Sequence, residues 1–442
     1  MAVIPTHQVE DAGLDEPIKK LTAEKIQQVV KHVITKETAA RFQVYLDTCV
    51  RCGLCADACH TCISRDGDPE YSPVAKVKHT IWELIKNDGK VAPDTLRSMA
   101  RIAFTECNVC RRCSMYCPFG IDIAYLLLTM RRICSLLGVV PQYLQDTTNS
   151  HSATMNQMWV QQDEWIDTLQ WQEEEARDEI TTARIPLEKE GAEIMYSVIA
   201  PEPKILAQLL GNMAQIFTVA GADWTMPATD GWDNSNMAMY SGDFEIMSRV
   251  EKLHWETAAR LKVKKIVMGE CGHAFRGAVY DGPRWLGWKF PPIPMVHAVE
   301  YYYDLLSTGK IKIKEKFKEP ITLQDPCNIV RGRGLGDKLR WVMNALCEDF
   351  RDVSPNHEHN FCCMAGGGTI NCGPPWKNSR MVSNRVKAEQ FERTGAEYIC
   401  TPCHNCHSGI EDIVGYYKLG MHVKFISEIL VQTMEIPEEL QA

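Results

Sequence analysis

CVRCGLCADAC, residues 49–59, and CNVCRRCSMYC, residues 107–117, are the stretches that decide the fold of the first part of the chain. Each has the spacing C-x2-C-x2-C-x3-C, the pattern that binds [4Fe–4S] clusters through cysteine thiolates. Where two such runs occur, the fourth cysteine of each run ligates the cluster of the other run. We therefore expect two crossed ligand sets, Cys49, Cys52, Cys55 and Cys117 in one, and Cys107, Cys110, Cys113 and Cys59 in the other.

Structural zinc is the alternative interpretation of these thiols. Zinc sites usually draw on two separated C-x2-C pairs, whereas both runs here carry four cysteines. The pattern therefore favours iron–sulfur clusters. Two features depart from it, since His60 rather than proline follows Cys59, and the spacing assigns no role to the extra thiol of Cys62.

The residues between the two runs carry helical signals. SPVAKVKHTIWELIKN, residues 72–87, repeats apolar side chains at the spacing of one helix face. PDTLRSMARIAF, residues 93–104, begins with proline and aspartate, which suit a helix start. We expect an α-helical ferredoxin domain over residues 41–150, preceded by a helical segment at residues 1–40.

The composition limits the class of protein. The 442 residues, 45% of them hydrophobic, suffice for two or three domains, and the net charge of −9 disfavours nucleic acid as a partner. The sequence begins without the regions of a signal peptide, and the longest apolar run, near Ile123–Met130, is too short for a bilayer span. Nineteen cysteines without an export signal indicate metal or redox chemistry in a soluble or peripheral protein.

Residues 151–192 are expected to form a helical linker. TMNQMWVQQDEWIDTLQWQEEEARDEI, residues 154–180, is helical in character. Its apolar side chains fall on roughly one helix face, and this face either packs on the ferredoxin domain or serves as a docking site for a partner protein. Its apolar residues are Met155, Met158, Trp159, Trp165, Ile166 and Leu169.

The pattern of the sequence changes at about residue 193, from mainly helical segments to alternating strand-like and helical segments. The segments EIMYSVIA, KKIVMGE, PITLQD and EYICT have the character of buried strands, with helical stretches between them. The expected fold class is therefore α + α/β, a helical ferredoxin domain followed by α/β units. An internal repeat divides this half into units at residues 193–310 and 311–442.

The repeat pairs particular positions of the two units. Aligning KKIVMGECGHAF with EYICTPCHNCHS pairs Cys271 with Cys403 and Met268 with Cys400, and an upstream match pairs Glu202 with Cys327. Because the first unit keeps one cysteine where the second carries five, we expect the first unit to be degenerate.

The stretch FCCMAGGG, Phe361–Gly368, lies in the second unit. Adjacent cysteines form a disulfide only with strained geometry, but adjacent thiolates can bind two irons of one open cluster. Gly366, Gly367 and Gly368 would leave room for inorganic sulfide and allow positive φ. A phosphate-binding loop is the competing interpretation, and it lacks the lysine and the Ser or Thr that such a loop requires.

The spacing C-x34-CC-x36-C-x2-C resembles the CCG domain of heterodisulfide reductases, with Met364 as a small departure. A helical two-cluster domain followed by paired units resembles the D subunit of heterodisulfide reductase, over about residues 35–435. Within that family the degenerate first unit is similar to the DsrK, TmcB and HmcF subunits of the sulfate reducers' transmembrane redox complexes. The resemblance implies one non-cubane [4Fe–4S] cluster, held by Cys327, Cys362, Cys363, Cys400 and Cys403.

Other residues are weaker candidates. Cys271 is either an extra ligand or redox-active thiol, or an inert buried cysteine. His273 and Glu270 are candidate catalytic residues that would deliver protons to a thiolate, although a histidine bonded within a loop is the plain alternative. The arginines that follow Cys327 either attract an acidic partner and stabilise reduced clusters or form a solvated face. They are Arg331, Arg333 and Arg340.

Haem, flavin and nicotinamide are not expected. CTPCH and CHNCH fit the haem c attachment pattern, but attachment requires export and the two matches share Cys403. His404 and His407 are then expected beside cluster ligands or at a helix start. No flavin or NAD fingerprint is found, so the chain is not expected to accept a hydride by itself.

The resemblance implies an oxidoreductase that acts on sulfur groups, passing electrons between a membrane partner and a thiol or disulfide, the latter a small molecule or protein. The implied partners are a cytochrome b subunit that exchanges electrons with menaquinone and a multihaem cytochrome c. The implied location is peripheral, on the cytoplasmic face of the inner membrane. The alternatives are a pure electron-transfer subunit and the iron–sulfur subunit of a quinone-linked flavoprotein dehydrogenase.

Overall fold

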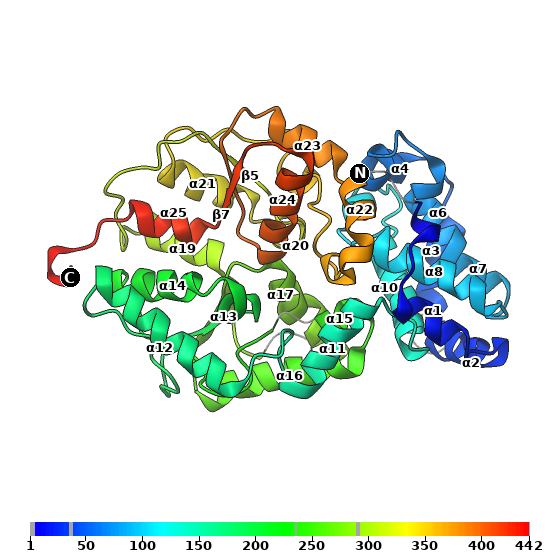
Figure 1. Ribbon diagram of the computed structural model, residues 1–442, viewed down its shortest axis with the longest axis horizontal. Helices are drawn as coiled ribbons and strands as arrows, with labels where there is room; N and C mark the ends of the chain where they lie inside the picture. The colour runs from blue at the N-terminus through cyan, green and yellow to red at the C-terminus, as the bar shows by residue number, and fades with distance from the viewer. Residues whose placement is uncertain (1–4, 35–38, 235–236, 289–291, 442) are drawn as a thin grey trace.

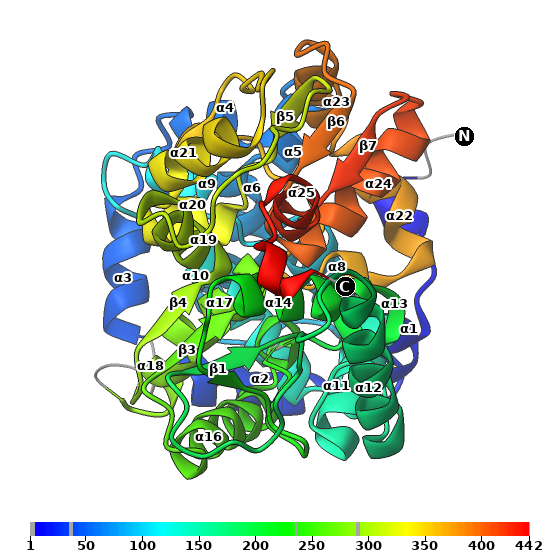
Figure 2. The ribbon, with the colours of Figure 1, turned by 90° about the vertical axis from the view of Figure 1, so that its left-hand side faces the viewer.

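The computed structural model describes residues 5–34, 39–234, 237–288 and 292–441. Helices make up the first part of the chain, which lies at one end of the molecule in blue and cyan (Figure 1). Two small sheets with their covering helices form the rest (Figure 2). The predicted fold class, a helical ferredoxin-like domain followed by α/β structure, is confirmed.

The helical part surrounds the two cysteine runs. Side chains cap the first two α-helices, since Asp11 accepts from the backbone N–H of Gly13 and Thr22 accepts from that of Lys25. A π-helical turn, η4 (Lys78–Trp82), interrupts the helix expected at residues 72–87. The helices are α1 (Ala12–Ile18), α2 (Ala23–Val33), α3 (Ala39–Thr48), α4 (Leu54–Ala58), α5 (His60–Ile63), α6 (Pro73–Val77), α7 (Glu83–Lys86), α8 (Pro93–Thr105), α9 (Arg112–Met115), α10 (Ile123–Leu136) and α11 (Gln142–Thr154).

The first α/β unit contains a four-stranded parallel sheet in the order β2-β1-β3-β4. Its strands are short and mostly buried, as in sheets that helices cover. The strands are β1 (Ile194–Ser197), β2 (Trp224–Thr225), β3 (Lys265–Met268) and β4 (Met295–His297), and the helices are α13 (Pro201–Ile205), α14 (Gln208–Val219), α15 (Met237–Ser241), α16 (Phe244–Arg260), α17 (Gly272–Arg276), α18 (Gly282–Trp285) and α19 (Ala298–Ser307).

The second unit repeats this plan with a three-stranded parallel sheet in the order β5-β6-β7. Strands were expected at PITLQD and EYICT, and β5 and β6 lie there. The strands are β5 (Ile321–Leu323), β6 (Tyr398–Cys400) and β7 (His422–Lys424), and the helices are α20 (Cys327–Arg333), α21 (Gly336–Leu346), α22 (Pro374–Val382), α23 (Arg385–Glu392), α24 (His404–Tyr417) and α25 (Ile426–Thr433). One hydrophobic core joins both units, and a second fills the helical part.

The segment between the helical part and the first sheet differs from its prediction. Helix α11 ends at Thr154 and α12 begins at Gln162 and ends at Glu179, so Met155, Met158 and Trp159 lie outside any helix. Helix α12 packs on α14 of the first unit rather than on the ferredoxin domain.

The two halves meet at the fully buried Arg131 of α10. Its guanidinium donates to the backbone oxygens of Cys107 at 2.6 Å, Tyr240 at 2.9 Å and Gly367 at 2.5 Å. One side chain therefore ties the second cysteine run to the first unit and to the glycine loop of the second unit. Burying a cation is costly unless it is hydrogen-bonded, and these carbonyls supply the bonds.

Candidate metal centres

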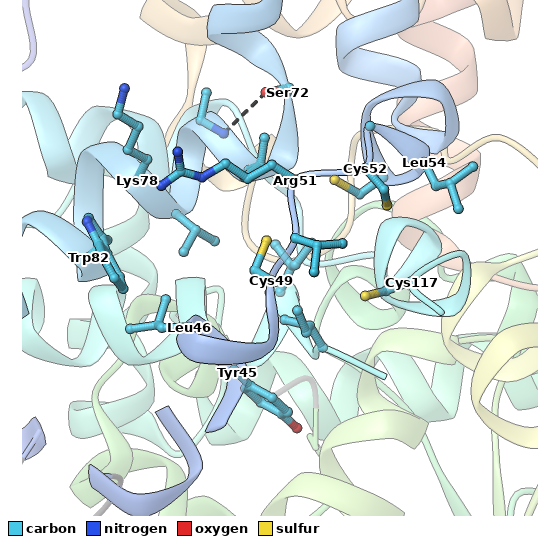
Figure 3. Close-up of a pocket in the computed structure, with 18 of the residues that line it drawn as sticks. Tyr45, Leu46, Cys49, Arg51, Cys52, Leu54, Ser72, Lys78, Trp82 and Cys117 are labelled. Carbon is cyan, nitrogen blue, oxygen red and sulfur yellow. Dashed lines mark hydrogen bonds between the residues drawn. The ribbon is translucent and has the colours of Figure 1, made fainter. Parts of the chain in front are cut away.

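The first group of thiols is the predicted set Cys49, Cys52, Cys55 and Cys117. All four line one pocket of about 320 Å³, where Figure 3 labels Cys49, Cys52 and Cys117. Cys52 is exposed, whereas the others are partly buried. Burial and the neighbouring thiolates raise the pKa of Cys55 to about 11. A protonated thiol is a poor ligand, so a bound metal ion is what would hold this group in the thiolate form.

The second group is the other predicted set, Cys59, Cys107, Cys110 and Cys113, which line one small pocket together. Buried Lys76 belongs to the same pocket, where its ammonium donates to the Glu106 backbone oxygen at 2.6 Å and lies 3.9 Å from the Cys59 sulfur. Four thiols around a buried cation fit a four-thiolate cluster, whose negative charge Lys76 offsets. The structure thus brings together both crossed sets, while ligation itself remains a prediction.

A third group of thiols lies at the carboxyl ends of β5 and β6. Cys327 begins α20 just after β5, Cys403 precedes α24 just after β6, and Cys362 and Cys363 come from the loop between them. Ligands commonly bind at this end of parallel strands. The fifth member is Cys406, whose sulfur lies 3.3 Å from that of Cys363.

Cys400, expected in this group, lies elsewhere. It is the last residue of β6, and successive side chains of a strand point to opposite faces. Ile399 packs with the third group, whereas Cys400 packs in the other core near Cys347 and Glu270. The C-x2-C pair of the site is therefore Cys403 and Cys406. The sequence CTPCHNC contains two overlapping C-x2-C pairs. The alternation of side chains along the strand is the signal that could have shown which pair faces the site.

The thiols of the third group form a continuous series with the second group. Cys110 packs against the hydrophobic cluster that contains Cys362 and Cys363, and hydrogen bonding to Cys362 lowers the pKa of Cys110. Hydrogen bonds with the thiols of Cys362 and Cys406 lower the pKa of Cys363. The Asn108 side-chain amide also donates to the Cys362 sulfur at 2.7 Å. The second and third groups of thiols are therefore directly adjacent.

The degenerate unit reaches the same site. The thiols of Cys271 and Cys403, which the repeat pairs, are linked by a hydrogen bond, and burial raises the pKa of Cys271. Glu202, paired in the repeat with Cys327, lies 2.9 Å from the ring nitrogen Nε2 of His404. The first unit thus clamps the turn that presents Cys403.

The Glu270 carboxylate points to the start of α25 rather than to the thiol groups, whereas the catalytic role expected of His273 stays a prediction. The Glu270 carboxylate accepts from the backbone N–H groups of Ile426 at 2.9 Å and Ser427 at 2.7 Å, and from the Tyr302 hydroxyl at 3.1 Å. It caps α25, although burial raises its pKa to about 7. The His273 ring is buried and stacks on Tyr240 at 3.8 Å.

Two of the three arginines after Cys327 are structural rather than a solvated face. Arg331 donates to the backbone oxygens of Cys110 at 3.0 Å and Asn360 at 2.8 Å, which joins the second group to the third. Arg340 pairs with Asp325 and Asp352. The Arg333 side chain is 38% exposed and pairs with Glu300.

The histidines after Cys403 lie beside the third group. His404 pairs with Glu202, and the ring of His407 stacks on Phe425 at 4.3 Å. Both rings are buried. His404 begins α24, so the expected helix-start position is found, while a supporting role beside cluster ligands stays a prediction.

The glycines of FCCMAGGG allow the two halves of the molecule to pack closely against each other. Gly367 and Gly368 have φ of 64° and 75°. A Cβ on Gly367 would lie 2.2 Å from the Asn108 backbone oxygen, and one on Gly368 would touch Leu144 and Tyr240 at 3.3 Å. The loop is therefore bare because it packs against the second cysteine run, and a Cβ on Gly366 would meet nothing within 4 Å.

Comparisons with known proteins agree with this geometry. A family model described as a 4Fe-4S dicluster domain matches residues 45–121, and one described as a cysteine-rich domain matches residues 321–411. The chain is 26% identical to an Hdr-like menaquinol oxidoreductase iron-sulfur subunit 2 of Archaeoglobus fulgidus, covering 92% of this chain and 84% of the relative.

Two further relatives extend the similarity. The D subunit of the dihydromethanophenazine:CoB–CoM heterodisulfide reductase of Methanosarcina barkeri is 24% identical, covering 90% of this chain and 97% of the relative. An EtfAB:quinone oxidoreductase of Syntrophomonas wolfei is 22% identical, covering 88% of this chain and 58% of the relative. The resemblance to iron–sulfur proteins like the D subunit of heterodisulfide reductase is confirmed, and a redox role is supported. Among the described residues, no helix combines the length and apolarity that crossing a bilayer requires.

Proposed function

We propose that this chain is the iron–sulfur redox subunit of a membrane-associated respiratory complex, and that it moves electrons between a quinone or cytochrome partner and a cytoplasmic thiol or disulfide. The observation that carries the proposal is the packing of Cys110, from the second thiol group, against the hydrophobic cluster that contains Cys362 and Cys363, together with the hydrogen bond from the Asn108 amide to the Cys362 sulfur. Because these groups are directly adjacent, electrons can pass from the ferredoxin domain into the CCG unit without leaving the protein.

The proposed cofactors are two cubane [4Fe–4S] clusters and one non-cubane [4Fe–4S] cluster. The first two groups of thiols would hold the cubanes, and the third would hold the non-cubane cluster with Cys406 in place of Cys400. When bound, the clusters supply one-electron carriers, and the third also supplies irons that bind sulfur. Cys271 lies close enough to Cys403 to be a further ligand or a redox-active thiol.

The chain's own residues bury the third site and balance its charge. Lys387, fully buried, donates to the side-chain oxygens of Asn360 at 3.0 Å and Gln390 at 2.5 Å. Burial lowers the pKa of Lys387 to about 7, against the charges of Asp325, Cys363 and Cys406, which favour its protonated form. When protonated, Lys387 offsets part of the charge of the thiolates.

The overall reaction balances as a disulfide reduction. One S–S bond breaks, two electrons and two protons enter, and two thiols form. A quinol oxidised at the membrane partner supplies both electrons, and the reverse direction returns them to a quinone.

The proposed partners are a membrane cytochrome b that exchanges electrons with menaquinone and a multihaem cytochrome c of the same complex. The menaquinol oxidoreductase names of relatives support the quinone link. Val50, Leu54 and Phe119 are exposed apolar residues close to Cys52, so the first group presents a face on which a partner can dock. The proposed location is peripheral, on the cytoplasmic face of the inner membrane.

Anaerobic iron and sulfide analysis combined with EPR of the oxidised protein tests the proposal. We expect about twelve irons per chain, and an oxidised-state signal that changes when a thiol or disulfide is added. About eight irons, with only reduced cubane signals, would show that the third group holds no cluster.

The second candidate function is an electron-relay subunit of a quinone-linked flavoprotein dehydrogenase. The similarity to an EtfAB:quinone oxidoreductase favours it. In that case the third cluster would give no thiol-dependent spectral change, and a flavoprotein would purify with the chain.

A further inference from the structure

We infer that Arg276, which the degenerate first unit supplies, is a positioning residue. Its cation offsets the negative charge of the third cluster site and raises the reduction potential of that site. The inference rests on the proposed function, because it requires a cluster at the third group. Arg276 would give the first unit a role at a site whose thiols come from the second unit.

Arg276 lies where three parts of the molecule meet. It is the last residue of α17, and only 2% of its surface is exposed. Its guanidinium donates from Nη1 to the Val109 backbone oxygen at 3.0 Å and to the Asn328 side-chain oxygen at 3.4 Å. Val109 lies between two thiols of the second group, and Asn328 follows Cys327.

Among the described residues, the hydrogen bonds of Arg276 leave one nitrogen, Nη2 with its two N–H donors, without an acceptor. Nε donates to Asp281 at 2.9 Å, whereas buried Nη2 has no hydrogen-bond partner among the described residues. Leaving a buried charged donor unpaired is costly. An electron-rich ligand shell beside Cys327, made of thiolate and sulfide, would supply the acceptor that this nitrogen lacks.

The charges around Arg276 agree with this assignment. Burial alone would lower its pKa, but Tyr240, Asp281 and Cys327 raise it overall. Asp281 is shared with Arg111, whose guanidinium lies 3.8 Å from its second oxygen. Because Asp281 interacts with both arginines, it neutralises Arg276 only in part. The remaining positive charge of Arg276 can interact with the thiolate of Cys327.

A single short helix connects the first unit to two ligands of the second. Cys271 caps the start of α17 and bonds Cys403, and Arg276 ends α17 near Cys327. Helix α17 also packs against α20, which Cys327 begins. A fixed buried cation stabilises the more negative, reduced state of a nearby redox group. Arg276 should therefore favour reduction of the third site.

The test uses the full chain, purified anaerobically, with Arg276→Gln, Arg276→Lys and a matched control, Arg284→Gln. Arg284 is exposed and lies eight positions further along the same segment. Redox titrations followed by EPR would measure the midpoint potential of the third-site signal, with the first cubane as internal reference. We expect a lower midpoint in Arg276→Gln, a smaller shift in Arg276→Lys and none in Arg284→Gln.

Each outcome decides a different question. A third-site midpoint in Arg276→Gln equal to that of Arg284→Gln overturns the role of Arg276 while leaving the proposed function intact. Absence of any third-site signal in the unmodified protein overturns both. If Arg276→Gln loses the irons of the third site alone and Arg276→Lys keeps them with a lowered midpoint, the role of the cation is supported.

Discussion

At the scale of single residues, the thiols differ in what surrounds them. Burial raises the pKa of Cys347 and of Cys372 to about 12, and each lies in a hydrophobic core. These two thiols stay protonated and are structural. Cys363 and Cys406 are just as buried, but each has other thiols as neighbours. Grouping, rather than burial, therefore marks the thiols that can hold iron.

Replacing Cys406 tests the ligand set at this scale. We expect Cys406→Ala to lower the iron content from about twelve to about eight per chain, because it removes one ligand of the third site. Cys400→Ala is the matched control and should keep the full iron content, since its side chain faces the other core. Anaerobic iron analysis of both variants decides between them, and iron loss in Cys400→Ala alone would restore the ligand expected from the sequence.

The sequence predicts single residues only as far as local spacing specifies them. The crossed sets follow from spacing alone, and the structure groups Cys59 with Cys107 and Cys117 with Cys49 accordingly. The choice of Cys406 over Cys400 depends on which face of β6 points to the loop, and that is a tertiary property. Arg276 had no signal in the sequence, because its partners are distant in the chain.

At the scale of elements, α12 illustrates how a periodic pattern can be placed wrongly. The apolar residues from Met155 to Leu169 suggested one continuous face. Met155 and Trp159 instead adopt positive φ values of 54° and 56°, which end α11 and separate it from α12. The helical residues Trp165 and Leu169 are buried, as the pattern predicts. Periodicity thus located the helix, whereas the turn depended on contacts that periodicity does not encode.

The packing of α12 gives a prediction with a control on the same helix. Trp165 is fully buried, stacks on Trp232 at 4.3 Å and donates to the Pro227 backbone oxygen. We expect Trp165→Ala to lower the free energy of unfolding by about 3–5 kcal/mol, because it leaves a large cavity. Trp171 is 53% exposed, so Trp171→Ala should change it by no more than about 0.5 kcal/mol.

Urea unfolding followed by circular dichroism, under anaerobic conditions, measures both variants. Equal effects of the two substitutions would contradict the packing of α12 described here. A large effect of Trp171→Ala on assembly with a partner, with unchanged stability, would instead assign its exposed face to docking.

At the scale of the whole molecule, three thiol groups form a series from an exposed face to a buried end. Cys52 of the first group is exposed, and Cys403 of the third is buried between the two α/β units. The internal repeat explains the buried end, because paired positions such as Cys271 and Cys403 meet in space. The sequence predicted the repeat and the pairing. It did not predict that the first unit would act as a clamp on the second.

The series is continuous only while the glycine loop stays against the second cysteine run. Gly367→Ala tests this, because a left-handed alanine costs about 1–2 kcal/mol and its Cβ would lie 2.2 Å from the Asn108 oxygen. We expect the loop to move away, which weakens the magnetic interaction between the second and third clusters in EPR of the reduced protein. Gly366→Ala is the matched control, since a Cβ there meets nothing within 4 Å. An unchanged interaction in Gly367→Ala would mean that Arg131 and Arg331 alone hold the two sites together.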